Sequence, residues 1–185
     1  LHEDVGADAI KKQLTLNFSE LKLSVIHGCH SLRPREVMGF DDSFVPRITD
    51  TLITTTGAES LDWKGKLECC GAPLAGINDE LAETLLNEKI EGAQSAGADY
   101  VTPICAYCHL QFDTTQLRLK GSGERKTLPV LLFPQLLGLC LGIDEKQLGI
   151  SENSTIEQAD IDHLKTMLGP PVENKKKKRK KKVAA

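Results

Sequence analysis

Cysteine spacing limits the folds open to this chain more than any other property of its 185 residues. Five of the six cysteines fall into three groups, which are Cys29, the adjacent Cys69 and Cys70, and the Cys-x-x-Cys pair of Cys105 and Cys108. Each group comes after a short β-type run and before a segment with helical spacing of apolar residues. The pattern therefore indicates a fold that gathers the ends of successive strands.

The segments around these groups alternate between strands and helices. Strands are predicted where β-branched and other apolar residues run together between turn-forming residues, and helices where apolar residues recur every three or four positions. The predicted strands are Leu21–Ile26, Ser60–Trp63, Asp99–Ile104 and Pro129–Phe133, and the predicted helices are Pro46–Thr56, Asp79–Ala96, His109–Leu119 and Pro134–Leu141. Such alternation is typical of an α/β fold, here with a parallel sheet of about four strands and flanking helices.

A parallel sheet would collect the cysteines at one edge. Parallel strands all end on the same side, and α/β proteins bind ligands in the crevice beyond those ends. We therefore expect the cysteine groups to lie at the carboxyl ends of strands and to form one site. The predicted ligands of a metal or cofactor, through which catalysis would run, are Cys29, Cys69, Cys70, Cys105 and Cys108.

Five thiols exceed what the common metal sites need. Tetrahedral zinc takes four ligands and a cubane cluster takes one thiolate per iron, so a fifth converging cysteine indicates a larger or irregular centre. Adjacent cysteines reach one centre only from an irregular loop, which Gly71 and Pro73 provide. Two alternatives stay open, which are a structural zinc site that uses four of the cysteines and a Cys-x-x-Cys redox pair beside buried free cysteines.

Supporting roles are predicted for other residues near the cysteines. Three histidines would contact the metal, donate to the site or bond to the backbone, and these are His27, His30 and His109. Lys66 and Arg33 would either offset negative thiolate charge or lie in solvent. Cys140 falls in the apolar run LLGLCLG, so it is expected to be buried outside the site.

Composition and charge narrow the cellular setting. A chain of this size needs no disulfides to fold, no apolar run approaches the roughly 18 residues of a membrane helix, and the polar stretch Leu1–Lys12 is unlike an export signal. These points predict a cytoplasmic protein whose cysteines bind metal. The run Lys175–Lys182 carries eight positive charges within a net charge of −3, so the rest is acidic and no nucleic-acid partner is expected.

Three sequence segments resemble a known family. HGCHSLRP, KLECCGAPL and CAYCHLQFDTTQ occur in the order and spacing of the cysteine-rich CCG domain of the heterodisulfide reductase B subunit. LHEDVG, TGAESLDW, SAGADYVTPIC and LPVLLFPQLLGLCLG extend the likeness over about Leu1–Ile150, and the segment is most similar to the second, C-terminal CCG half of such proteins. Cys140 and the basic tail depart from the family pattern.

The resemblance implies both a cofactor and a function. Family members hold a noncubane [4Fe-4S] cluster between five cysteines, and each of these has a counterpart among the five predicted ligands. The implied protein is the iron–sulfur subunit of a heterodisulfide reductase-like oxidoreductase, which takes part in disulfide cleavage or one-electron transfer. Its implied partners are another CCG half, a ferredoxin-like iron–sulfur subunit, a flavin subunit and a disulfide substrate. The alternative is an electron-transfer or structural metal-binding module without a substrate site of its own.

The chain is expected to divide into three parts. Residues 1–150 hold the predicted strands, helices and ligands and would form the CCG iron–sulfur domain. Residues 151–174 would be a polar C-terminal segment. Residues 175–185 would be a basic tail, in which the repulsion of like charges favours disorder.

Overall fold

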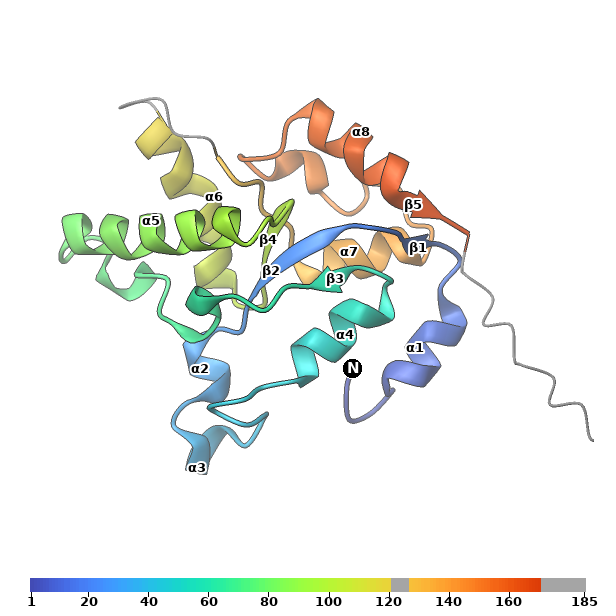
Figure 1. The fold of residues 1–185 in the computed structure, drawn as a ribbon, viewed down its shortest axis with the longest axis horizontal. Helices are drawn as coiled ribbons and strands as arrows, with labels where there is room; N and C mark the ends of the chain where they lie inside the picture. The colour runs from blue at the N-terminus through green and yellow to red at the C-terminus, as the bar shows by residue number, and fades with distance from the viewer. Residues whose placement is uncertain (121–126, 171–185) are drawn as a thin grey trace, which may run out of the picture.

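A three-stranded parallel sheet lies at the centre of the computed structural model, which describes residues 1–120 and 127–170. The strands are β2 (Lys22–Ile26), β3 (Glu59–Ser60) and β4 (Tyr100–Pro103), in the order β3-β2-β4. Helices lie between and around the strands (Figure 1). The predicted α/β class and the parallel direction of the strands are therefore confirmed.

The fourth predicted strand joins the sheet by a single bridge. Val130 forms a parallel bridge with Val101, and backbone hydrogen bonds of 2.9 Å run from Val101 N to Pro129 O and from Leu131 N to Val101 O. Pro129 has no amide hydrogen to donate, and the next helix begins at Phe133. Few residues are therefore available for further strand pairing with β4. The regular sheet therefore has three strands, with this segment lying along β4.

Short helices and 3₁₀ turns connect and cover the strands. The remaining elements are α1 (Ala7–Gln13), β1 (Asn17–Phe18), α2 (Cys29–Leu32), α3 (Arg35–Met38), α4 (Ile48–Thr55), η1 (Lys64–Leu67), η2 (Ala72–Leu74), α5 (Asp79–Ser95), α6 (Ala106–Lys120), α7 (Phe133–Cys140), η3 (Ile150–Glu152), α8 (Gln158–Met167) and β5 (Leu168–Gly169). The long helix α5 begins where its capping residue predicts, because Asn78 Oδ1 accepts a hydrogen bond from Leu81 N at 3.1 Å.

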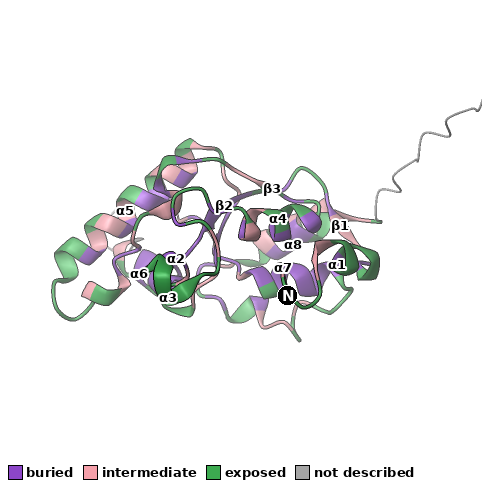
Figure 2. Ribbon diagram, turned by 90° about the horizontal axis from the view of Figure 1, so that it is seen from below, coloured by how far each residue is buried: buried purple, intermediate pink, exposed green. Residues whose placement is uncertain are grey.

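Alternation along the strands divides the interior into two hydrophobic cores. Leu23 and Val25 of β2 belong to the first core, together with residues of α1, α4, α7 and α8. Ile26 of β2 and Val101 of β4 belong to the second core, which α5 and α6 complete. Neighbouring strand residues point to opposite faces of the sheet, so apolar side chains lie on both faces, and helices cover each of them. Figure 2 shows the buried strands between these helices.

The last described segment returns to the beginning of the fold. Helix α8 buries Ile161 and Leu164 in the first core, and β5 pairs antiparallel with β1, which sets Phe18 opposite Leu168. No signal in the sequence predicted this two-residue pair. The boundary between an iron–sulfur domain and a polar C-terminal segment stays a prediction, and the predicted basic tail over residues 175–185 lies outside the described residues.

A buried carboxylate fastens α6 to the segment that follows η3. Asp113 is 5% exposed, and its oxygens accept hydrogen bonds from Ser154 N, Thr155 N and Thr155 Oγ1, each at 2.8 Å. Burial acts to raise the pKa of Asp113, but these donors outweigh it and hold the pKa below its ordinary value. A charged carboxylate inside the protein thus holds in place the helix that carries Cys108.

The substitution Asp113→Asn is expected to lower the free energy of unfolding at pH 7 by roughly 1–3 kcal/mol, because a neutral amide replaces a charged acceptor of several hydrogen bonds. The pKa of Asp113 is lower in the folded protein than in the unfolded chain. Its contribution is therefore present above the unfolded pKa and is lost as the pH falls through the folded pKa. In urea unfolding, the gap between the two proteins should begin to narrow below about pH 4. A gap that is as large at pH 3 as at pH 7 would contradict this account.

Candidate metal centre

Cys29 lies directly beyond the carboxyl end of β2. The strand ends at Ile26, and Cys29 is the first residue of α2. The intervening Gly28 has a φ of 69°, and a Cβ atom on it would lie 3.2 Å from the Cβ of Cys105. This close approach favours glycine, and it makes the first and third cysteine groups neighbours.

Cys69 and Cys70 lie in an irregular loop between η1 and η2. The strand β3 ends well before them at Ser60, because Trp63 buries its ring in the second core and the chain turns away from the sheet edge into η1. The prediction that each cysteine group follows a strand end is therefore wrong for this pair. The loop itself is as irregular as predicted, since Gly71 has a φ of 84° and its N–H donates to Cys69 Sγ at 3.4 Å.

Cys105 and Cys108 frame the start of α6. The strand β4 ends at Pro103, Cys105 precedes the helix, and Cys108 lies in its first turn. Residues three apart lie on one side of a helix, so the two thiols are directed the same way. Cys108 is buried and Cys105 is half-buried, which places this pair partly in the second core and partly at the surface.

Four of the five predicted ligands line one pocket of about 370 Å³. The pocket opens at the surface beside α6, where Tyr107 is 74% exposed. The side chains that line it belong to Cys29, His30, Cys70, Ala72, Pro73, Cys105, Tyr107 and Cys108. The structure thus brings together residues from all three cysteine groups.

The thiols lie close enough to alter one another's ionisation. Burial raises the pKa of Cys29, and the neighbouring thiols of Cys69 and Cys70 raise it further. A hydrogen bond between Cys70 and Cys108 lowers the pKa of Cys70 and raises the pKa of Cys108. The neighbouring Cys105 also raises the pKa of Cys108. Cys69 is therefore joined to the other four, and all the predicted ligands form one continuous cluster of thiols.

These thiols surround a space rather than a point. Within residues 1–120 and 127–170, no group of three or more His, Cys, Asp and Glu side chains is arranged to hold a single metal ion. Four of the five cysteines instead line the pocket described above. Any group bound by all of them would have to fill that volume.

Cys140 lies apart from this cluster. It is fully buried at the end of α7 in the first core, and its Sγ lies 3.7 Å from Thr56 O, to which it donates. Burial raises the pKa of this thiol to about 12. The prediction that Cys140 is a buried residue is therefore confirmed.

The three flanking histidines occupy different environments. His30 is exposed and lines the pocket. His27 is buried at the end of β2, and its Nε2 lies 3.5 Å from Asp50 Oδ2. Burial lowers the pKa of His109, whose Nδ1 has no hydrogen-bond partner among the described residues. Of the three, His30 is the one that borders the pocket.

Lys66 forms a half-buried ion pair with Asp50 and does not line the cysteine pocket. Its Nζ lies 2.8 Å from Asp50 Oδ2, and Ser60 Oγ donates to Asp50 Oδ1 at 2.5 Å. Burial opposes ionisation of Asp50, but the contacts with His27, Lys66 and Ser60 outweigh it and lower the pKa of Asp50 to about 2. The charge of Lys66 is thus matched by a carboxylate.

Arg33 links two loops near the cysteines. Its Nη1 donates to Leu67 O and its Nη2 donates to Ser43 O, both at 3.4 Å. Arg33 lies just after α2, and Leu67 ends the η1 turn that leads to Cys69. The guanidinium therefore ties together the segments that carry the first two cysteine groups.

Two charged residues of this region were not among the residues predicted from the sequence. Asp50 belongs to no motif, and nothing local indicates that it meets Lys66. Lys89 is buried on α5, where it follows Leu86 by three positions and precedes Ala93 by four. Helical spacing alone places Lys89 on the buried face, so a signal for it was present.

Comparison with known proteins agrees with this arrangement. Residues 23–113, which contain the five predicted ligands, match the family model CCG, described as a cysteine-rich domain. The chain is 36% identical over 158 residues to the B subunit of the ferredoxin:CoB-CoM heterodisulfide reductase of Methanosarcina mazei, an alignment that covers 83% of this chain and 52% of that protein. It is 34% identical over 151 residues to the 8-methylmenaquinol:fumarate reductase membrane anchor subunit of Wolinella succinogenes, covering 80% of this chain and 52% of that one.

The chain thus spans about half the length of these relatives. A solved structure of a hypothetical protein from Helicobacter pylori shares the fold, with a TM-score of 0.55 at 14% identity over 82% of this chain and 28% of that one. The helices within the described residues are too short or too polar to cross a membrane. The chain therefore carries a CCG cysteine-rich domain and is homologous to the B subunit of heterodisulfide reductase.

Proposed function

We propose that Cys29, Cys69, Cys70, Cys105 and Cys108 hold an iron–sulfur cluster of the noncubane [4Fe-4S] type. The chain would then be the iron–sulfur subunit of a heterodisulfide reductase-like oxidoreductase. The observation that carries this proposal is the pocket of about 370 Å³, which thiols from distant segments of the chain line together. Homology to an oxidoreductase subunit supports the same conclusion.

The pocket suits such a cluster in its donors and in its size. Thiolates are the usual ligands of iron–sulfur clusters, and the potential metal ligands of this pocket are four thiols and the ring of His30. A structural zinc site closes around one ion, with sulfur atoms at about 2.3 Å, and leaves no room of this kind. Donors and volume together favour a cluster over the zinc alternative.

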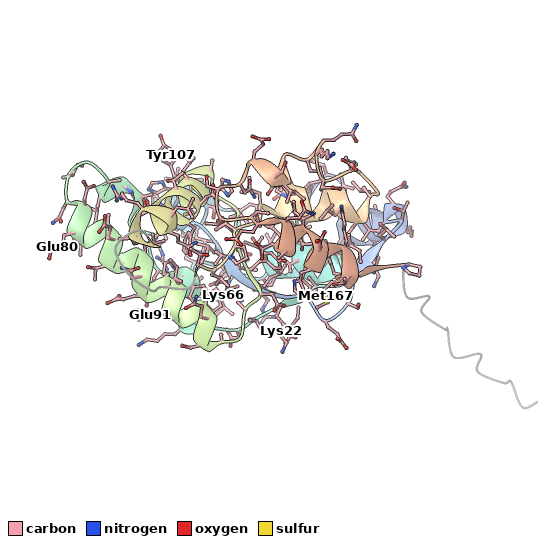
Figure 3. The ribbon with its side chains drawn as sticks, turned by 90° about the horizontal axis from the view of Figure 1, so that it is seen from above. Lys22, Lys66, Glu80, Glu91, Tyr107 and Met167 are labelled. Carbon is pink, nitrogen blue, oxygen red and sulfur yellow. The ribbon has the colours of Figure 1, made fainter. Side chains whose placement is uncertain are left out.

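A bound cluster would supply one-electron transfer, and the residues of this chain would hold it and control access to it. Cys70 and Cys108 are buried and would anchor its inner side, whereas Cys29 and Cys105 are half-buried and lie nearer the opening. Tyr107 projects from α6 to the outside of the molecule at this opening (Figure 3). A disulfide substrate or a partner protein would approach from this side.

The proposed reaction is the reduction of a disulfide by two electrons and two protons to give two thiols. The electrons would come one at a time from a ferredoxin-like iron–sulfur subunit and a flavin subunit. Since this chain aligns with only about half of each relative, we propose that it corresponds to the second CCG half and that another CCG half completes the substrate site.

A second candidate is an electron-transfer module without its own substrate site. The coverage of 52% of each relative favours it, because the chain alone offers one cysteine pocket among its described residues. Adding a disulfide to the reduced protein together with the other CCG half separates the two candidates. Oxidation of the protein with release of thiols supports a substrate site to which this chain contributes, and an unchanged reduced spectrum supports the module.

Protein prepared without oxygen is expected to contain about four iron and four sulfide per chain, since a [4Fe-4S] centre has this composition. Iron, acid-labile sulfide and zinc would be measured on the same sample. One zinc per chain without sulfide would refute the proposed cluster.

A further inference from the structure

Lys89 is a fully enclosed lysine on the helix that borders the double-cysteine loop. It is 1% exposed and lies on the buried face of α5 with Leu86, Ile90 and Ala93. Its Nζ donates a hydrogen bond to Gly65 O of η1 and lies 5.3 Å from the centroid of the Trp63 ring. An ammonium group is thus held in a defined place inside the protein.

This ammonium has no carboxylate partner among the described residues. The ion pairs there join other groups, and the contacts of Lys89 are to a neutral carbonyl and an aromatic face. Enclosing an unpaired charge costs several kcal/mol unless other charges offset it. A carbonyl and a ring offset only part of this cost, so a nearby negative group is needed to explain a buried lysine here.

The negative groups whose charges act on Lys89 are the exposed carboxylate of Glu68 and three thiols of the cluster. Burial lowers the pKa of Lys89, while the charges of Glu68, Cys70, Cys108 and Cys69 act to raise it. Cys70 and Cys108 lie in the second core with Trp63 and with α5 residues that flank Lys89. The lysine and these two thiols are thus enclosed in the same part of the interior.

The turn that accepts the hydrogen bond of Lys89 also leads directly to the cysteine pair. Gly65 belongs to η1, which ends at Leu67, just before Cys69 and Cys70. Lys66 differs from Lys89 in that Asp50 already matches its charge. The charge of Lys89, unlike that of Lys66, is not paired with a carboxylate among the described residues, so it is free to act on the buried thiols.

We propose that Lys89 is a positioning residue that sets a fixed positive charge behind Cys70 and Cys108 and thereby raises the reduction potential of the cluster. This inference rests on the proposed function. Reduction adds one negative charge to the site, and a nearby positive charge in a medium of low polarity stabilises the reduced form more than the oxidised form. The charge of Lys89 thus makes the cluster easier to reduce.

The test compares reduction potentials of the anaerobic protein in titrations with dithionite, followed by visible absorption. Lys89→Gln keeps a donor for Gly65 O but removes the charge, Lys89→Met removes both, and Lys89→Arg keeps the charge. Both neutral variants are expected to have more negative potentials than the wild type. Lys64→Gln is the matched control, because Lys64 is exposed on the same turn η1 and water screens its charge. Its potential is expected to equal that of the wild type.

Each outcome decides the question. A wild-type potential in Lys89→Gln with full iron would overturn the inference, as would an equal shift in Lys64→Gln. If the neutral variants fail to hold iron, retention of iron by Lys89→Arg supports the need for a charge, and loss in all three variants assigns Lys89 to packing alone. Wild-type protein without iron and sulfide would overturn the proposed function itself, a result that iron analysis reveals before any titration.

Discussion

Alanine in place of either Cys69 or Cys70 is expected to remove most of the bound iron and sulfide. The reason is that the proposed irregular cluster uses every one of the five thiolates, so that no sulfur is spare. Both residues lie in one loop. Cys70 lines the pocket, and the neighbouring Cys69 raises the pKa of Cys29. Iron content and visible absorption of anaerobically purified protein would measure the effect.

The matched control for this pair is Cys140→Ala. Cys140 is buried in the first core, away from the pocket, so its loss should cost about 1 kcal/mol of stability and no iron. A site with four ligands, whether zinc or a cubane, would tolerate loss of one member of the adjacent pair. If Cys69→Ala or Cys70→Ala keeps as much iron as Cys140→Ala, the five-ligand proposal is wrong.

The second large effect is expected from Gly71→Ala, which leaves all five thiols in place. Gly71 has a φ of 84°, and a Cβ atom on it would lie 2.7 Å from Ala82 O in the backbone of α5. Alanine is strained in this left-handed backbone conformation, and its Cβ clashes with the backbone of α5. Together the two effects should lower the free energy of unfolding by roughly 3–4 kcal/mol. Because the loop must move, Cys70 is displaced and the iron content should fall as well.

Gly76→Ala separates the clash from the strain. Gly76 has a similar φ of 80°, but nothing lies within 4 Å of the position its Cβ would take. Its substitution should cost about 1–2 kcal/mol and leave the iron content unchanged. Chemical unfolding of cluster-free protein and iron analysis of loaded protein would compare the two variants. Equal effects of the two substitutions would mean that close packing against α5 does not shape the cysteine loop.

Local patterns were sufficient to place two of the three cysteine groups. Cys29 and Cys105 each follow an apolar run that pairs in the sheet, and the turn-forming residues after those runs mark the strand ends. The ligand assignment itself stays a prediction, since it depends on what the pocket binds.

Tertiary contacts decided the features that the sequence patterns missed. Trp63 buries its ring in the second core, so the chain before Cys69 forms a turn where a strand end was predicted. The pairing of Phe18 with Leu168 joins segments far apart in the chain and leaves no local signal. Lys89 lay on a predictable face, but only the packed structure reveals that its buried ammonium pairs with no carboxylate among the described residues and is close enough for the thiol charges to act on it.

The antiparallel pair of β1 and β5 fixes where a domain fused beyond β5 would start. The pair lies at one end of the molecule, and the helices α2 and α5 beside the thiols lie at the other (Figure 1). Because this chain is proposed to be the second half, the other half would precede it, and a CCG half fused beyond β5 instead would start from the end of the molecule remote from the pocket. Its linker would then have to run the length of the molecule before two pockets came face to face. Two halves on separate polypeptides would meet without that constraint, so tether length becomes a design requirement for any single-chain version of the assembly.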